Sequence, residues 1–131
     1  MSLRHRASLV LIKNGSILLV RRENERGLYY IFPGGGVNEG ESVEQAVVRE
    51  TMEEAGMEVE ARYVLADIVS DYDHNTLVVC HQLDDTEPEW QEKEKQTAED
   101  AYLFEWVPLT EISQLNLLPK EGSEAVRHAF L

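Results

Sequence analysis

Cysteines, long apolar runs and basic residues are all scarce in this sequence, and each shortage excludes a class of protein. The single cysteine, Cys80, can form no internal disulfide, so a scaffold held by internal disulfides is excluded. No apolar run is long enough to cross a bilayer, and the first residues lack the apolar core of a signal peptide. We therefore expect a cytoplasmic protein without a membrane partner.

The shortage of basic residues leaves a strongly acidic chain. Twelve lysines and arginines stand against 25 aspartates and glutamates, which gives a formal net charge of −13. Such a surface repels phosphate backbones, so we expect no binding to bulk nucleic acid. Binding of small phosphorylated ligands is still compatible with this charge, because divalent cations or local arginines can screen it. The 131 residues suffice for one core, and without a linker or repeat we expect a single domain over 1–131.

Apolar, β-branched runs alternate with turn signals along the chain. Asn14-Gly15 suits a type I′ turn, so we expect a hairpin within residues 7–22, followed by a polar loop over 23–27. Further strands are expected at 28–32, 57–73, 76–83 and 101–109, with a turn near 73–75. Residues 84–100 are charge-dense and indicate an exposed loop, whereas short helical segments are expected at 110–115 and after Pro119. This order is typical of an α+β or α/β sandwich.

One helix has strong end signals. Ser42 and Gln45 match a capping box, residues 43–55 contain neither glycine nor proline, and Gly56 is a natural stop. At about 100° per residue, one broad apolar arc of this helix would face the core. Its members are Val43, Val47, Val48, Thr51, Met52 and Ala55.

Three carboxylates lie together near the end of this helix. Glu50, Glu53 and Glu54 are spaced i, i+3, i+4 and share one surface that overlaps the edge of the apolar arc. Like charges repel at such a boundary, and Arg49 alone cannot neutralise them. Mg²⁺ or Mn²⁺ would, because these hard cations prefer carboxylate and water oxygens. A plain solvated face is the alternative, since glutamate is a good helix former.

The glycines before the helix complete a motif. Glycine permits close backbone approach to a ligand. Residues 35–57 resemble the Nudix box, G-x5-E-x7-R-E-U-x-E-E-x-G-U, in which U is aliphatic. The matching residues are Gly35, Glu41, Arg49, Glu50, Glu53, Glu54, Gly56 and Met57. Thr51 departs at the first U but is isosteric with valine, and the upstream FPGGG and late EWVPL are also similar to family members.

This resemblance implies an α/β/α sandwich, in which helices flank a mixed β-sheet. It implies hydrolysis of a nucleoside diphosphate linked to another moiety X, with Mg²⁺ as cofactor and Mn²⁺ as a substitute. The small size favours a nucleoside triphosphate or a dinucleoside polyphosphate; ADP-ribose or a nucleotide sugar is the alternative. A non-catalytic nucleotide-binding module is the alternative of another class, although such members usually lose a box glutamate. A homodimer is expected by analogy alone.

The resemblance also assigns roles within the box. The metal ligands would be Glu50, Glu53 and Glu54. The carbonyl of Gly34 or Gly35 would add a ligand, and Gly34 is the closer match to the family's usual position. Arg49 would hold the glutamates by ion pairing, Glu41 would be structural or an outer partner of the metal, and Gly56 would be structural.

The sequence leaves two choices for the residue that acts as general base. A carboxylate that is not fully used as a metal ligand can take a proton from the attacking water. Glu53 or Glu54 of the box is one choice. Glu99 or Asp100, just before the strand at 101–109, is the other, against the simpler interpretation that both only solvate an acidic loop.

Substrate contacts rest on weaker signals. Arg21 and Arg22 end a strand and can reach substrate phosphates, although both would also suit a plain surface. Tyr30, beside the glycines, can stack on a base, but aromatic residues in strands are more often in the core. Gly35 would let the backbone approach the substrate closely.

Overall fold

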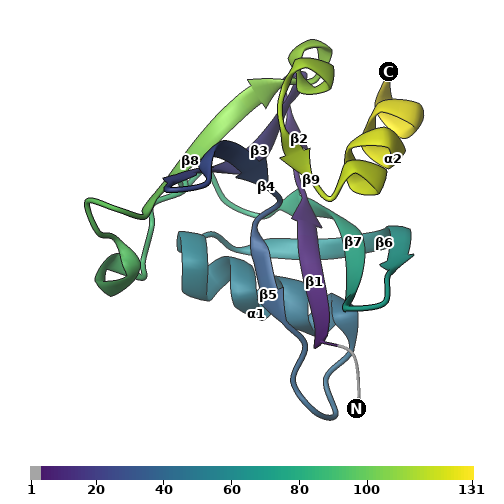
Figure 1. Ribbon diagram of the computed structural model, residues 1–131. Helices are drawn as coiled ribbons and strands as arrows, with labels where there is room; N and C mark the ends of the chain where they lie inside the picture. Colours follow the sequence, from purple (N-terminus) through teal and green to yellow (C-terminus); the bar gives the residue numbers. More distant parts are fainter. Residues whose placement is uncertain (1–3) are drawn as a thin grey trace.

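The strands of the computed structural model, which describes residues 4–131, form two sheets (Figure 1). The first is a mixed sheet with the spatial order β5 (Gly34–Gly36), β1 (Arg4–Val10), β7 (Asp73–Gln82) and β6 (Val59–Val69). In it β1 and β7 are parallel, and the other neighbours are antiparallel. The second sheet has the order β2 (Ile12–Lys13), β3 (Ser16–Asn24), β4 (Gly27–Ile31) and β9 (Leu117–Leu118), with β8 (Ala101–Pro108) paired to β3.

Two helices pack on opposite faces of the mixed sheet, α1 (Val43–Ala55) and α2 (Lys120–Phe130). The alternation of side chains along β1 shows this directly, because neighbours on a strand point to opposite faces. Ala7 and Leu9 belong to the cluster that contains Val47 of α1, whereas Val10 belongs to the cluster that contains Val126 of α2. This arrangement confirms the expected α+β fold. Two short 3₁₀ helices, η1 (Lys93–Lys95) and η2 (Leu109–Gln114), lie in the later connections.

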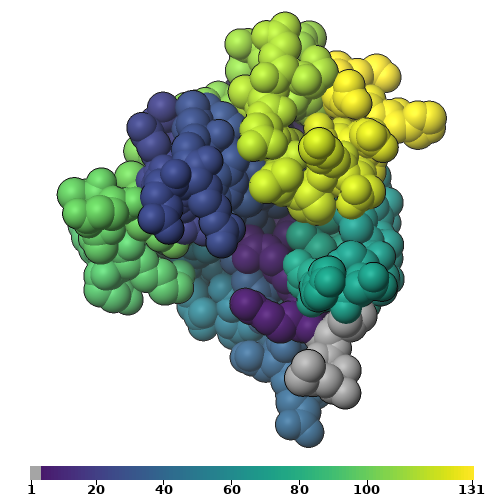
Figure 2. All heavy atoms as spheres, in the orientation of Figure 1, coloured from purple at the N-terminus to yellow at the C-terminus, as the bar shows by residue number. Residues whose placement is uncertain are grey.

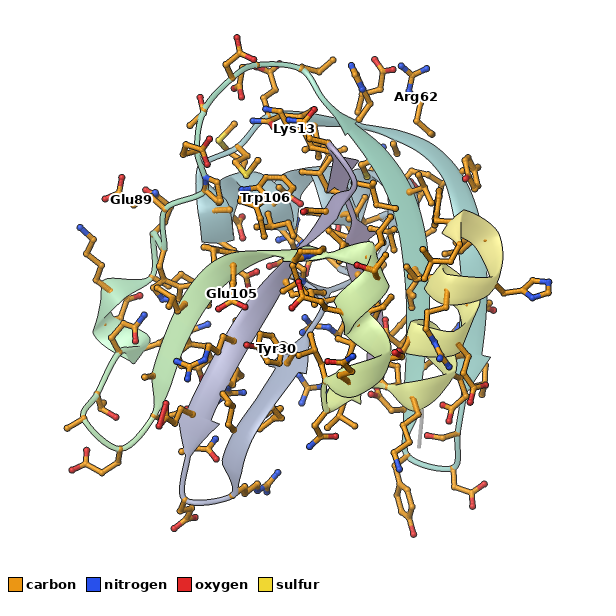
Figure 3. All side chains as sticks on the ribbon, turned by 90° about the horizontal axis from the view of Figure 1, so that it is seen from above. Lys13, Tyr30, Arg62, Glu89, Glu105 and Trp106 are labelled. Carbon is orange, nitrogen blue, oxygen red and sulfur yellow. The ribbon has the colours of Figure 1, made fainter. Side chains whose placement is uncertain are left out.

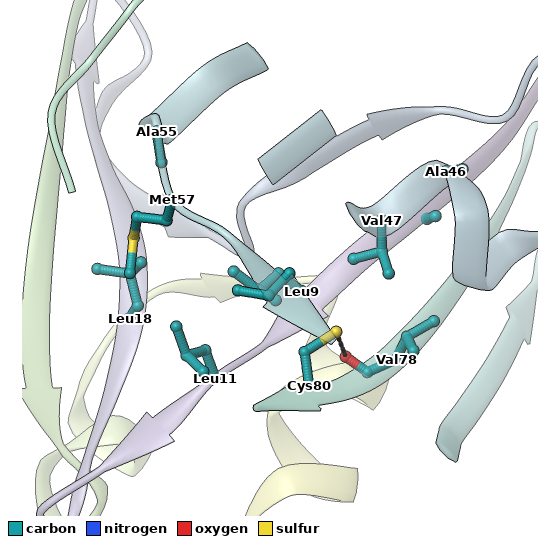
Figure 4. Packing of buried hydrophobic residues seen from close by; sticks show 11 residues of the cluster. Leu9, Leu11, Leu18, Ala46, Val47, Ala55, Met57, Val78 and Cys80 are labelled. Atoms are coloured by element: carbon teal, nitrogen blue, oxygen red, sulfur yellow. Dashed lines mark hydrogen bonds between the residues drawn. The ribbon is translucent and has the colours of Figure 1, made fainter. Parts of the chain in front are cut away.

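The cluster between α1 and the mixed sheet is shown in Figure 4. Leu9, Leu11 and Met57 are completely or almost completely buried there. Cys80 also lies in this cluster, where its Sγ is 3.7 Å from the carbonyl oxygen of Val78. Burial raises the pKa of the Cys80 thiol to about 12, so this side chain acts as a small apolar core residue.

The helix signals in the sequence are confirmed. Both hydrogen bonds of the Ser42–Gln45 capping box are present, and Gly56 ends α1 in the left-handed conformation with a φ of 69°. The expected apolar arc is wrong at one position: Met52 is 47% exposed. Within residues 4–131 no helix has the length and apolar character needed to cross a membrane.

Several expectations about the strands need correction. The loop expected over 23–27 is reduced to residues 25–26, because β3 extends to Asn24 and β4 begins at Gly27. The turn at Asn14 and Gly15 is present, but it joins β2 to β3, and the strand before it divides at Leu11 between the two sheets. The glycines at 34–36 form a strand, because they pair with β1. The turn expected at 73–75 lies at 70–72, since Asp73 already pairs with Arg4.

Candidate active site

The end of α1 lies against the glycine strand β5, and this contact builds the site. A β-carbon at position 35 would collide with the carboxylate of Glu50, so only glycine leaves room for that side chain. The backbone N–H of Gly34 donates to Oε1 of Glu54 at 3.2 Å. Two carboxylates of the helix are thus set against the backbone of the preceding strand.

Arg49 connects the parts of the box. Its Nε and Nη2 donate to the two carboxylate oxygens of Glu41 at 2.8 and 2.9 Å. Its Nη1 donates to Glu50 at 2.8 Å and to Glu53 at 3.1 Å, and Nη2 also donates to the carbonyl of Gly36 at 2.9 Å. Bonding to Arg49, with the backbone N–H of Asn38, lowers the pKa of Glu41 to about 2. The ion pairing that the motif implied for Arg49 is present.

The three glutamates differ in their exposure. Glu53 is open to solvent, the Glu50 side chain is 17% exposed, and Glu54 is only 8% exposed. Burial raises the pKa of Glu54 to about 7, although the charge of Arg6 works in the opposite direction. A bound cation would favour the ionised form of such a carboxylate. This donor set of carboxylate oxygens fits a hard divalent ion such as Mg²⁺.

Glu50 and Glu54 open into a cavity of about 310 Å³. Its other walls bring Arg6, Arg22 and Glu92 to the same space. The negative charge of Glu92 contributes to the raised pKa of Glu54. The cavity therefore combines carboxylates that can hold a cation with arginines that can hold phosphates.

Glu92 is a residue that the sequence interpretation missed. Trp90 places it: the indole stacks on the Tyr102 ring with centroids 4.8 Å apart, and its Nε1 donates to the carbonyl of Glu92 at 2.7 Å. A lone tryptophan in an acidic loop was the available signal, because its burial must anchor the loop. Glu99 does not line the cavity of the glutamates but a separate one of about 1090 Å³.

Another cavity, also of about 310 Å³, adjoins the cavity of the glutamates. Both cavities are lined by Arg6, whose Nη2 donates to the carbonyl of Phe32 at 2.8 Å. The second one combines apolar walls with Ser8 and the buried Asn75, and the Ser8 hydroxyl donates to Asn75 Oδ1 at 2.7 Å. Figure 2 shows this region as a hollow with β1 (purple) at its floor, framed by β4 (blue), the start of α2 (yellow) and the β6–β7 turn (teal).

The expected substrate residues fall on different sides of the second sheet. Arg22 faces the glutamates' cavity, with Nη2 at 2.7 Å from Asp100 Oδ1 and 2.6 Å from the Tyr102 hydroxyl. Arg21, next to it on β3, must point to the opposite face. Tyr30 is 7% exposed in the core, and its hydroxyl donates to Glu105 at 3.1 Å; both are labelled in Figure 3. The structure therefore does not bring Arg21 and Tyr30 to the glutamates.

Curated proteins match segments of this chain, among them the following two. An ADP-ribose pyrophosphatase of Methanocaldococcus jannaschii is 46% identical over 50 residues, which are 37% of this chain and 29% of that protein. An RNA pyrophosphohydrolase of Shewanella piezotolerans is 38% identical over 58 residues, 44% of this chain and 32% of that protein. The matched segments thus span less than a third of either relative.

Solved structures match over much more of the chain. A MutT NUDIX hydrolase from Burkholderia pseudomallei is 26% identical with a TM-score of 0.63, over 84% of this chain and 86% of that one. A NUDIX-family hydrolase from Clostridium perfringens has a TM-score of 0.72 at 13% identity, with both chains covered completely, and shows the shared fold. A family model described as the NUDIX domain matches residues 3–129. Because this match extends over nearly the whole sequence, the chain belongs to the Nudix hydrolase family.

Proposed function

We propose that this protein hydrolyses a phosphoanhydride bond in a nucleoside diphosphate linked to another moiety X, with Mg²⁺ as its cofactor and Mn²⁺ as a substitute. The observation that carries this proposal is the pairing of Glu50 with the buried Glu54 at the wall of one cavity. Burial raises the pKa of the Glu54 carboxyl, and a cation there would offset the cost of its charge.

Glu50, Glu53 and Glu54 would hold the metal, with the carbonyl of Gly34 as an added ligand. A bound divalent ion would neutralise phosphate oxygens and lower the pKa of a coordinated water. Arg49 orients the carboxylates, since its guanidinium contacts Glu50 and Glu53 at once. The chain's own task is then to position the phosphates and to accept a proton.

Carboxylates of the box, Glu53 or Glu54, and of the later loop are candidates for the proton acceptor. Glu53 belongs to the box and is exposed, whereas Glu92 comes from the later loop and lines the cavity beside Glu54. Glu99 lines a different cavity, so we assign the loop role to Glu92. General base catalysis by such a group typically contributes about 10²–10⁴-fold to the rate.

The adjoining cavities suggest how a nucleotide would lie. Arg6 lines both of them, so phosphates near Arg6 would reach the glutamates while a nucleoside enters the cavity of Ser8 and Asn75. Apolar walls with a few placed polar groups are typical of a small-ligand site. These two cavities favour a compact substrate, a nucleoside triphosphate.

A larger substrate is the second candidate. The cavity of about 1090 Å³ shares Arg22 with the cavity of the glutamates and also contains Tyr29. The second moiety of a dinucleoside polyphosphate, ADP-ribose or a nucleotide sugar would fit there. A solved structure from Streptococcus suis bears the name ADP-ribose pyrophosphatase. It covers 98% of this chain, with 22% identity and a TM-score of 0.68.

A screen of nucleotides with and without Mg²⁺ tests the proposal. We expect metal-dependent release of pyrophosphate from a nucleoside triphosphate, or of a nucleoside monophosphate from a linked substrate. Glu53→Gln should lose most turnover while keeping its melting temperature, because Glu53 is 56% exposed and its role is charge. Glu58→Gln, an exposed glutamate beyond the helix, is the matched control. Turnover of the Glu53 variant at the wild-type rate would contradict the metal role, and nucleotide binding without cleavage of any compound would favour a non-catalytic module.

A further inference from the structure

We propose that His5, Asp67 and His74 form a binding site for a transition-metal ion such as Zn²⁺ or Co²⁺, with a ligand set separate from the box glutamates. These side chains come from three neighbouring strands of the mixed sheet, β1, β6 and β7. One ligand atom from each lies within 4.8 Å of the other two. His5 also lines the cavity of the glutamates, but the proposed metal chemistry of the box uses none of the three residues.

Strand register places the three residues together. His5 and His74 are direct partners in the parallel pairing of β1 and β7. Asp67 of β6 is the partner of Thr76, which points to the same face as His74 because the two are separated by two positions on one strand. Ligands on paired strands of a sheet are held more firmly than ligands on loops.

The hydrogen bonds of the cluster converge on one carboxylate oxygen. Thr76 Oγ1 donates to Asp67 Oδ1 at 2.6 Å, and His74 Nε2 lies 2.6 Å from the same oxygen. His5 Nε2 is 2.8 Å from Thr76 Oγ1. Because the threonine proton is used on Asp67, the His5 nitrogen must be the donor in that contact. A metal ion would take the place of the two imidazole protons.

Thr76 has the role of an orienting partner. It is 4% exposed and fixes the Asp67 carboxylate through its hydroxyl. Partners of this kind hold a ligand in position and raise metal affinity. The side chains of His74 and Asp67 are 26% and 55% exposed, so the remaining coordination positions are open to water.

The donor types decide which ion would bind. Two imidazoles with one carboxylate suit Zn²⁺, Co²⁺ or Ni²⁺, whereas Mg²⁺ prefers oxygen ligands alone. The two imidazole rings are stacked 3.8 Å apart with an interplanar angle of 3°. Nitrogen lone pairs lie in the ring planes, so one ring must rotate to share an ion with the other.

Titration of the metal-free protein with Co²⁺ tests this site, because Co²⁺ bound by histidine absorbs visible light. Added Zn²⁺ should displace the Co²⁺ and abolish this absorption. We expect wild-type protein to show this signal with one ion bound at the histidines, unaffected by excess Mg²⁺. His74→Gln and Asp67→Asn should each weaken Co²⁺ binding at least tenfold. The two side chains are 26% and 55% exposed, so we expect both variants to fold.

Two control variants separate this site from other metal binding. His128→Gln removes an exposed histidine on α2, and Glu53→Gln removes a ligand of the box; both should keep the Co²⁺ signal. Zn²⁺ should also raise the melting temperature of wild-type protein more than that of Asp67→Asn. An unchanged Co²⁺ affinity in His74→Gln, or loss of the signal in Glu53→Gln, would overturn the proposal.

Discussion

The carboxylate of Glu50 occupies the space that a β-carbon at position 35 would need. Gly35→Ala should therefore displace this carboxylate, which is the mobile end of a flexible side chain, and leave the backbone in place. We expect metal-dependent turnover to fall at least tenfold and the Mg²⁺ concentration for half-maximal rate to rise. Steady-state rates over a range of Mg²⁺ concentrations measure both quantities.

Gly36→Ala is the matched control for this prediction. A β-carbon at position 36 meets no atom within 4 Å, and the carbonyl that accepts from Arg49 is part of the backbone. Its rates and melting temperature should stay close to those of the wild type. Equal losses in both variants would show that the glycine strand tolerates no side chain at all, and that the Glu50 contact has no special role.

Arg49 contacts Glu41, Glu50, Glu53 and the Gly36 carbonyl through one planar guanidinium. Lysine is a point charge that cannot reproduce this fork of bonds. Arg49→Lys should therefore weaken apparent Mg²⁺ affinity by about 10–100-fold, as loss of an orienting partner does. Arg62→Lys, which alters an exposed pair with Glu60, should change nothing measurable. The same Mg²⁺ dependence in the Arg49 variant and wild type would refute the orienting role.

Glu54 should make the stability of the metal-free protein depend on pH. Its pKa rises from 4.5 in the unfolded chain to about 7 in the fold, mainly through burial. Between these values the folded protein keeps a proton that the unfolded chain has lost, so the free energy of unfolding decreases as the pH rises through this range. The full decrease, reached above pH 7, is about 3 kcal/mol.

Urea unfolding of metal-free protein from pH 4.5 to 8 measures this effect. In Glu54→Gln the same series should lack this part of the pH dependence, because the amide does not titrate. Added Mg²⁺ should stabilise the wild type most at high pH, where the carboxylate is ionised and free to bind it. Parallel pH profiles for wild type and variant would rule out Glu54 as the group responsible.

Glu92 and Glu99 allow a direct comparison of two carboxylates from the same acidic loop. Glu92 lines the cavity of the glutamates and Glu99 does not. Glu92→Gln should lower kcat by about 10²-fold or more if it accepts the proton. Glu99→Gln should leave kcat within about twofold of wild type, since surface changes seldom have large effects. A larger loss in Glu99→Gln would return the base assignment to that residue.

Local residue patterns were enough to predict the helix and the chemistry on it. The capping box at Ser42 and the stop at Gly56 act on the adjacent backbone, and the spacing of Glu50, Glu53 and Glu54 puts them on one helix surface in any fold. The hairpin turn at Asn14-Gly15 is equally local, because it depends only on residues that accept positive φ. The Nudix motif was readable for the same reason.

Which distant residues meet these glutamates depends on long-range packing. The side of the sheet on which Arg22 and Arg21 lie depends on register with β8, and the position of Glu92 depends on Trp90 packing against Tyr102. His5 and His74 are 69 positions apart in the chain, and Asp67 lies between them. The three meet because β1 pairs with β7 and β7 pairs with β6. Pairing between strands far apart in the chain is set by how the whole core packs, and local residue patterns do not specify it.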